Sequence, residues 1–242
     1  MQRKKIFLLL SLIIILSLSI VTAAFSLSAK NPSNEANQLQ LNNVFKNVGN
    51  FLRGNKDKLQ VDKGDIIAKV NNIPIYKSEF ELRKGLTLAS DAEIISNIDN
   101  YILNKLVREK VEEYLASSYN LKVSQDEINS YIEKEKKEFA DYPEANQMLQ
   151  EMISASGMTS EEYWNTYEKY NVKRLLLLDK LYNTIINNGI RSGKLEKTNS
   201  TTFSPQSEYK NYIDNIIEQY VKQAKISIND KYKDMFKDFT VN

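Results

Sequence analysis

The stretch Ile66-Ile67-Ala68-Lys69-Val70-Asn71-Asn72-Ile73-Pro74-Ile75-Tyr76-Lys77-Ser78-Glu79-Phe80 carries the signals of a strand, a turn and a helix in close succession. The alternation around Lys69 predicts a short strand. Asn71 and Asn72 predict a tight turn, because asparagine is among the few residues with a side chain that tolerate a left-handed backbone. A second apolar piece follows, and Ser78 with Glu81 predicts the capped start of a helix.

The chain beyond this stretch predicts a mainly helical protein. Apolar residues recur at helical spacing in four stretches, at about 90–115, 124–139, 145–155 and 159–188. Ser124 and Thr159 each stand three residues before a glutamate, which is the pattern of a capping box at a helix start. The charged run 133–138 predicts a solvated helix face.

This order of motifs resembles the SurA/PrsA-type N-terminal chaperone domain. That family opens roughly as A-x-V-N-G-x-x-I-x-x-x-E-F, and here Asn72 replaces the usual glycine. The residues that fit the opening are Ala68, Val70, Asn71, Ile75, Glu79 and Phe80. Residues 102–115 and 120–132 are similar to the family's second and third helices, and Gly157–Trp164 is similar to the entry to its fifth. The resemblance covers about residues 64–190.

The resemblance implies a domain organisation. Residues 64–190 would form a SurA-like helical chaperone core, and 191–206 would be a linker where relatives insert a parvulin prolyl isomerase domain. A returning helix and strand, 207–230, would complete the core and leave 231–242 as a tail. The fold class would be mainly α with a small two-stranded β element, in which a strand at about 66–71 pairs with one at about 224–229.

The composition excludes several kinds of chemistry. The 242 residues include no Cys and no His, which removes thiol nucleophiles, Ser-His-Asp triads and nearly all transition-metal sites. The isomerase site of the resembling family uses histidines and commonly a Cys or Asp. We therefore expect the chaperone half of the family without the enzyme half, with no cofactor and no metal. A buried carboxylate pair in a cleft would favour a hidden enzyme instead.

The N-terminus predicts the compartment. Arg3-Lys4-Lys5 precedes an apolar run from Ile6 to Val21 and a small-residue exit, the pattern of an export signal. Residues 1–29 are either a cleaved signal peptide or a retained anchor that contacts the membrane through 6–27. Both alternatives place the body outside the cytoplasm, secreted or anchored.

The charge balance argues against a nucleic-acid partner. Removing residues 1–23, which hold three basic residues, leaves 30 basic against 31 acidic residues, a net charge of −1. A nucleic-acid binder needs a basic stripe to release counterions, and the sequence has none.

Residues 30–63 are rich in Asn, Gln, Ser and Lys, so we favour a linker there. The alternative is an amphipathic helix over about 38–53 that packs in the domain.

The remaining function is the holding of unfolded or exported polypeptides. Aromatic and methionine side chains adapt to apolar segments of many sequences. The candidate client-binding residues surround the breaks at Pro143 and Gly157: Phe139, Tyr142, Met148, Met152, Met158, Trp164, Tyr167 and Tyr170. At helical spacing such residues are also typical of a core. The alternative function is a membrane-tethered structural or assembly factor with one specific envelope partner, which a strongly charged cradle or a dimer closed by the tail would favour.

Overall fold

The computed structural model describes residues 35–59, 64–90, 95–197 and 208–241. Over these residues the protein is mainly helical with a small antiparallel sheet, which confirms the predicted fold class at that level. The expected signal or anchor, 1–29, and most of the expected linker at 191–206 lie outside the described residues. None of the described helices is long and apolar enough to cross a membrane.

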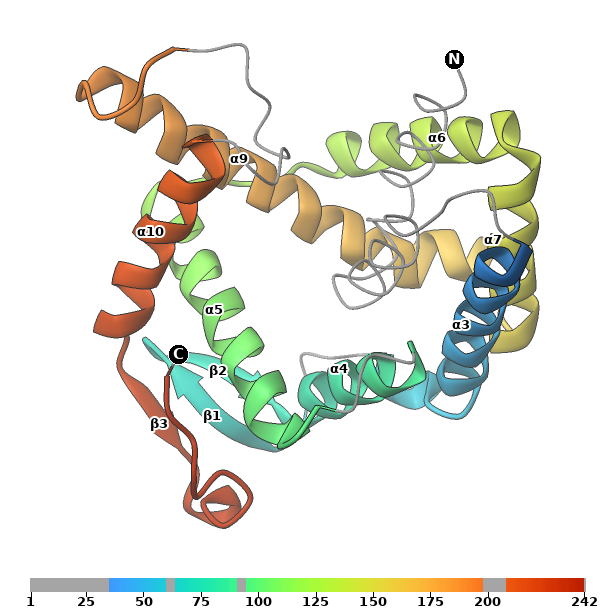
Figure 1. Cartoon of the computed structure of the whole chain (residues 1–242), viewed down its shortest axis with the longest axis horizontal. Helices are drawn as coiled ribbons and strands as arrows, with labels where there is room; N and C mark the ends of the chain where they lie inside the picture. Colours follow the sequence, from blue (N-terminus) through green and yellow to red (C-terminus); the bar gives the residue numbers. More distant parts are fainter. Residues whose placement is uncertain (1–34, 60–63, 91–94, 198–207, 242) are drawn as a thin grey trace. The chain divides into compact units, whose positions relative to one another are not determined.

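The described elements follow one another along the chain as shown in Figure 1. They are α3 (Glu35–Arg53), η1 (Lys56–Leu59), β1 (Ile66–Val70), β2 (Ile73–Tyr76), α4 (Lys77–Ala89), α5 (Ile98–Ser118), α6 (Gln125–Asp141), α7 (Pro143–Ser156), α8 (Ser160–Glu162), η2 (Tyr163–Glu168), α9 (Lys169–Arg191), α10 (Glu208–Gln223), β3 (Ile226–Ile228) and η3 (Asp230–Tyr232).

The chain divides into two compact units. Unit 1 holds the described residues before position 64 together with those in 81–96 and 124–173. Unit 2 holds 64–80, 97–123 and the described residues from 174 onward. The expected single core at 64–190 is therefore divided between two units, each built from several separate segments of the chain.

The sheet of unit 2 joins the two ends of that unit. Its strand order is β2-β1-β3, and Ala68 pairs with Ile228 in the antiparallel contact of β1 with β3. The predicted pairing is thus confirmed, but the sheet has three strands where two were expected. The left-handed backbone of Asn71 and Asn72, with φ of 49° and 70°, closes a two-residue hairpin and returns Ile73–Tyr76 onto β1 as β2.

The expected tail at 231–242 is wrong in its first part. Lys231 Nζ lies 2.6 Å from Asp65 Oδ2, and Tyr232 donates a hydrogen bond of 2.8 Å to the same oxygen. The Phe236 ring meets Phe80 edge-on with centroids 5.4 Å apart, and it is buried. These contacts make the segment after β3 part of the core of unit 2.

Helix α5 carries the central apolar residues of unit 2. Leu106, Val107 and Val111 are fully buried, and the helix contacts β1, β2 and α10. It begins at Ile98 rather than near 90, because Asn97 is in the left-handed conformation and its side chain caps the helix. Residues 91–94, within the expected first turn, lie outside the described residues. Helix α4 begins at Lys77, so Ser78 lies inside its first turn and is not the residue before it.

Helix α3 packs in unit 1, so the expectation of a linker at 30–63 is wrong over 35–53 and the packed helix is observed. Val44, Phe45, Val48 and Leu52 are buried, and α3 lies against α7. The two helices approach closely at Gly49. A Cβ there would lie 2.5 Å from the backbone oxygen of Met152 and 2.6 Å from Ala155 Cβ.

The other helix boundaries of unit 1 follow local sequence signals. Both capping boxes are present, at Ser124 and at Thr159. Pro143 occupies the first turn of α7, where its missing N–H costs nothing, and Gly157 ends that helix with φ of 63°. The helix predicted at 159–188 is continuous from Ser160 to Arg191 but contains a π-helical segment, η2, that the sequence did not predict.

We predict that Gly49→Ala destabilises unit 1. The added methyl group would overlap the backbone of α7, and overpacking of this kind costs about 1–3 kcal/mol. Urea unfolding followed by circular dichroism measures the change. Gly54→Ala is the matched control, because its nearest neighbour, Phe51 O, would lie 3.8 Å away. Equal losses of stability in the two variants would contradict the α3–α7 contact.

Candidate functional site

A surface pocket of about 620 Å³ lies in unit 1 between α6, α7 and the segment formed by α8 and η2. Its lining divides by burial into two groups. The floor consists of the buried residues Phe139, Leu149 and Trp164. The rim consists of polar residues that are exposed or half-buried: Lys136, Asn146, Gln150, Ser160, Glu161 and Asn165. Exposed Ala140 completes the lining.

The floor is held by ring contacts. Trp164 meets Phe139 edge-on, with centroids 6.2 Å apart, and meets Tyr163 in the same way at 5.1 Å. Lys136 Nζ lies 5.7 Å from the centroid of the Trp164 ring. Tyr163, Trp164, Tyr167 and Glu168 of η2 are buried together, and the Trp164 ring meets Phe139 of α6.

The structure brings two of the eight predicted client-binding residues together in the pocket, Phe139 and Trp164. Met148, Met152 and Tyr167 are buried outside its lining, Tyr142 and Met158 are half-buried, and Tyr170 is 46% exposed. The sequence prediction missed Leu149 and the whole rim. Asn146 and Gln150 stand four residues apart on α7, a spacing that could have indicated a polar edge beside Leu149.

Two buried glutamates form a second feature of unit 1. Glu135 on α6 is 2% exposed and Glu168 on η2 is 1% exposed. Glu168 Oε2 accepts hydrogen bonds from the Tyr163 hydroxyl at 2.8 Å and from Asn171 Nδ2 at 3.5 Å. Glu135 Oε2 and Glu168 Oε1 have no hydrogen-bond partner in the described part of the chain. The prediction of a solvated face at 133–138 is therefore wrong at Glu135.

Burial keeps this acidic pair, Glu135 and Glu168, partly protonated. Burial raises the pKa of Glu135 to about 9, and the negative charges of Glu168 and Glu138 add to the rise. Burial also raises the pKa of Glu168 to about 7, against the opposing effect of the hydrogen bonds from Tyr163 and Asn171. At neutral pH the pair holds at least one proton.

The acidic pair is the feature that would favour a hidden enzyme. Neither carboxyl belongs to the lining of the pocket, and both are shielded from solvent. A general acid or base must come within hydrogen-bond reach of the proton it transfers. The geometry of the described residues therefore gives the pair no access to a substrate, and it gives the enzyme hypothesis no support.

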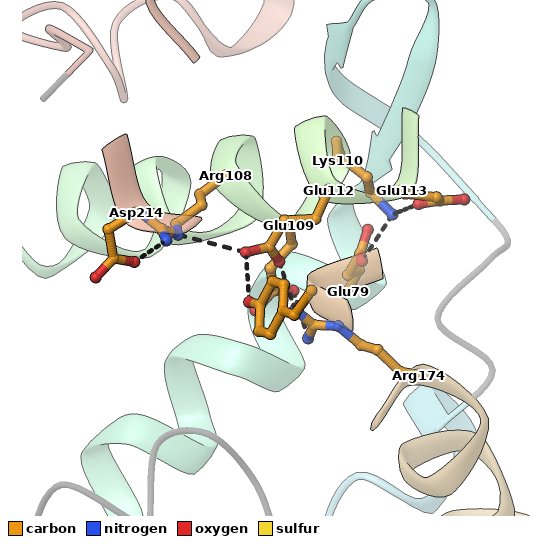
Figure 2. A network of polar contacts seen from close by, with 9 residues as sticks. Glu79, Arg108, Glu109, Lys110, Glu112, Glu113, Arg174 and Asp214 are labelled. Atoms are coloured by element: carbon orange, nitrogen blue, oxygen red, sulfur yellow. Dashed lines mark hydrogen bonds and ion pairs between the residues drawn. The ribbon is translucent and has the colours of Figure 1, made fainter. Parts of the chain in front are cut away.

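Unit 2 contains a different arrangement of charges (Figure 2). Buried Glu112 on α5 accepts a hydrogen bond of 3.0 Å from Tyr182 and lies 3.4 Å from Arg108 Nε and 3.9 Å from Arg174 Nη2. Arg108 Nη2 also lies 2.6 Å from Asp214 on α10. Burial raises the pKa of Glu112, whereas Arg174 and Arg108 lower it. Oppositely charged partners thus surround Glu112, in contrast to the acidic pair, and the network joins α5 to α9 and α10.

Comparisons with protein-family models, with curated proteins and with solved structures give no match. The resemblance to the SurA/PrsA-type domain therefore stays a prediction from sequence motifs.

We predict that Arg174→Met destabilises unit 2 by about 3 kcal/mol, because it removes a cation beside two largely buried carboxylates. One of these, Glu109, lies 2.7 Å from Arg174 Nη1, and the other is Glu112. Chemical unfolding measures the loss. Lys134→Met is the control: this lysine is 69% exposed and 3.8 Å from Glu138, so we expect a change below about 0.5 kcal/mol. A loss no larger than that of the control would show that the network is not stabilising.

We predict that the free energy of unfolding falls as pH rises, and that Glu135→Gln reduces this fall. A glutamate ordinarily loses its proton near pH 4.5, whereas folded Glu135 keeps it to about 9. The folded state binds the extra proton. The free energy of unfolding is therefore highest below about pH 4.5 and falls between about pH 4.5 and pH 9, by up to about 1.4 kcal/mol per pH unit. Urea midpoints measured across this interval test the prediction.

The matched control for this experiment is Glu144→Gln, which changes an exposed glutamate of α7. It should keep the slope of the wild type. The prediction fails if Glu135→Gln keeps that slope as well.

Proposed function

We propose that the protein is an extracytoplasmic chaperone that holds apolar segments of unfolded or exported polypeptides, without a cofactor and without isomerase activity. The observation that carries the proposal is the pocket of unit 1, with its apolar floor and polar rim. The motif resemblance and the export-like N-terminus support it from the sequence.

The floor suits an apolar side chain of any shape. The pocket volume of about 620 Å³ lies within the usual range for ligand sites, about 300–1,000 Å³. Burial of apolar surface is non-directional, so leucine, phenylalanine or methionine could each occupy it. Each would contribute about 1.5–3 kcal/mol when fully buried. Tolerance of many sequences is what a general holdase requires.

The rim suits the backbone of an extended peptide. Asn146, Gln150 and Asn165 each carry an amide that both donates and accepts hydrogen bonds, as the peptide group does. The hydroxyl of Ser160 has the same dual capacity. Because every polypeptide presents the same backbone groups, contacts of this kind do not depend on client sequence.

The alternative, an assembly factor with one partner, has less support. The rim carries one basic residue, Lys136, and one acidic residue, Glu161, so it is not strongly charged. Tyr232 and Phe236 of the expected tail are buried within unit 2. That burial removes two of the apolar residues with which the tail could close a dimer.

We predict that Ala140→Phe weakens client holding, because the new ring would occupy the pocket from an exposed position and leave the floor residues in place. The loss of one buried client side chain predicts at least about a tenfold loss of affinity. The measurement is light scattering by a chemically unfolded client as it aggregates, with the protein purified from expressing cells without truncation.

The matched control is Ser130→Phe, which adds the same ring to an exposed position of α6 outside the pocket. It should suppress aggregation as well as the wild type does. If the folded wild type fails to suppress aggregation, the chaperone proposal is wrong. Equal suppression by both variants would show that the pocket is not the binding site.

A further inference from the structure

We propose that the pocket of unit 1 keeps its peptide-binding form only while the acidic pair holds a proton, so that peptides bind at neutral or lower pH and are released at alkaline pH. The peptide part of this inference rests on the proposed function. The link between the proton and the pocket does not, because it can be measured without a peptide.

The acidic pair and the floor are successive layers of the contact between α6 and η2. Glu135 and Phe139 stand four residues apart on α6, and Trp164 and Glu168 stand four residues apart on η2, so each pair lies along one side of its helix. Phe139 meets Trp164 in the floor. Tyr163 joins the layers directly, since its ring meets Trp164 and its hydroxyl donates to Glu168.

Among the described residues, no positive charge acts on either carboxyl of the pair. On α6 the negative charge of Glu138 raises the proton affinity of Glu135. The Tyr163 and Tyr167 hydroxyls of η2 and the neutral amide of Asn171 on α9 face Glu168 of the pair. Arg83 of α4 acts on Tyr167, and no cation acts on either carboxyl among the described residues.

Loss of the proton would therefore leave two negative charges shielded from solvent, each with an oxygen that no group in the described part of the chain satisfies. Such charges are stable only if water enters or the helices separate. Either change acts on the contact between α6 and η2 that also holds Trp164 against Phe139. The π-helical segment η2 carries Glu168 as well as Trp164, so a change there would reach the acidic pair and the floor together.

The composition makes the effect measurable. The chain has no His and no Cys, so between about pH 6 and pH 9 ordinary side chains do not titrate, and only the α-amino group and buried carboxyls do. Glu112 is the other carboxyl with a raised pKa in the described chain, and it belongs to unit 2. The chain also has a single tryptophan, Trp164 in the floor. Its fluorescence reports on the pocket alone.

The first experiment follows Trp164 emission from about pH 6 to about pH 10 without a peptide, using the protein in the form that expressing cells produce. We expect one red-shifting transition in the wild type and in the control Glu144→Gln. Glu135→Gln, which keeps the shape and cannot lose the proton, should show none. A wild type whose emission does not change with pH, or a Glu135→Gln variant with the wild-type transition, overturns the inference. If Glu135→Gln does not fold, the wild-type titration alone decides, with Glu168→Gln as the second variant.

The second experiment measures the affinity of a tryptophan-free synthetic peptide with one phenylalanine and one leucine, by isothermal titration calorimetry over the same pH range. Above the transition the dissociation constant of the wild type should rise about tenfold per pH unit, and that of Glu135→Gln should stay constant. An affinity of the wild type that is independent of pH overturns the inference and leaves the chaperone proposal standing. No binding near pH 6 overturns the chaperone proposal, and the fluorescence titration still decides the coupling.

Discussion

The antiparallel contact between β1 and β3 is the constraint on which the organisation of this chain depends. It joins segments far apart in sequence, as in the hydrogen bond from Asn229 Nδ2 to the carbonyl oxygen of Ile66, across 163 positions. Closing so long a loop costs entropy, which the apolar layer around α5 and the Phe80–Phe236 contact offset. The elements from β2 to α10 therefore lie within one closed loop of the chain, whereas α3 and η1 precede it.

Unit 1 contains a buried acidic pair, from which we predict a lower stability at alkaline pH. The same helix contact carries an aromatic layer, in the floor of the pocket, and an acidic layer one turn away. Unit 2 also buries a carboxylate, but Arg108 and Arg174 compensate Glu112. In unit 1 a proton has that role for Glu135. A proton is lost as the pH rises, whereas an arginine stays charged, so we expect the contact around Glu135 to depend more strongly on pH than the contact around Glu112.

Local signals predicted much of the fold. The Asn71–Asn72 turn, the caps at Ser124 and Thr159 and the stop at Gly157 each depend on a few neighbouring residues, and each was found. The partner of β1 came from the motif resemblance. The packed helix α3 was only the alternative to a linker, because its polar composition outweighed the apolar stripe at Val44 and Val48. The acidic pair was missed because Glu135 stands in a charged run, and because its partner Glu168 lies on η2, a π-helical segment that the sequence did not predict. Phe139 and Trp164 of the floor were predicted as client-binding residues. The rim could not be predicted, because it depends on how α6, α7, α8 and η2 are arranged in space.

The size of the pocket helps to decide between the two proposed functions. One buried client side chain contributes about 1.5–3 kcal/mol and each hydrogen bond from the rim about 0.5–1.5 kcal/mol. A dissociation constant of 1 mM corresponds to about 4 kcal/mol, so a single site binds weakly. An unfolded chain offers many apolar segments. When one segment leaves the pocket another can bind, so the pocket stays occupied although each segment is released quickly. A dedicated partner would instead need several central anchors and an interface of about 1,200–2,000 Å². A pocket with one apolar floor and a rim that is not strongly charged therefore favours repeated contacts with many client sequences over one permanent contact with a single partner.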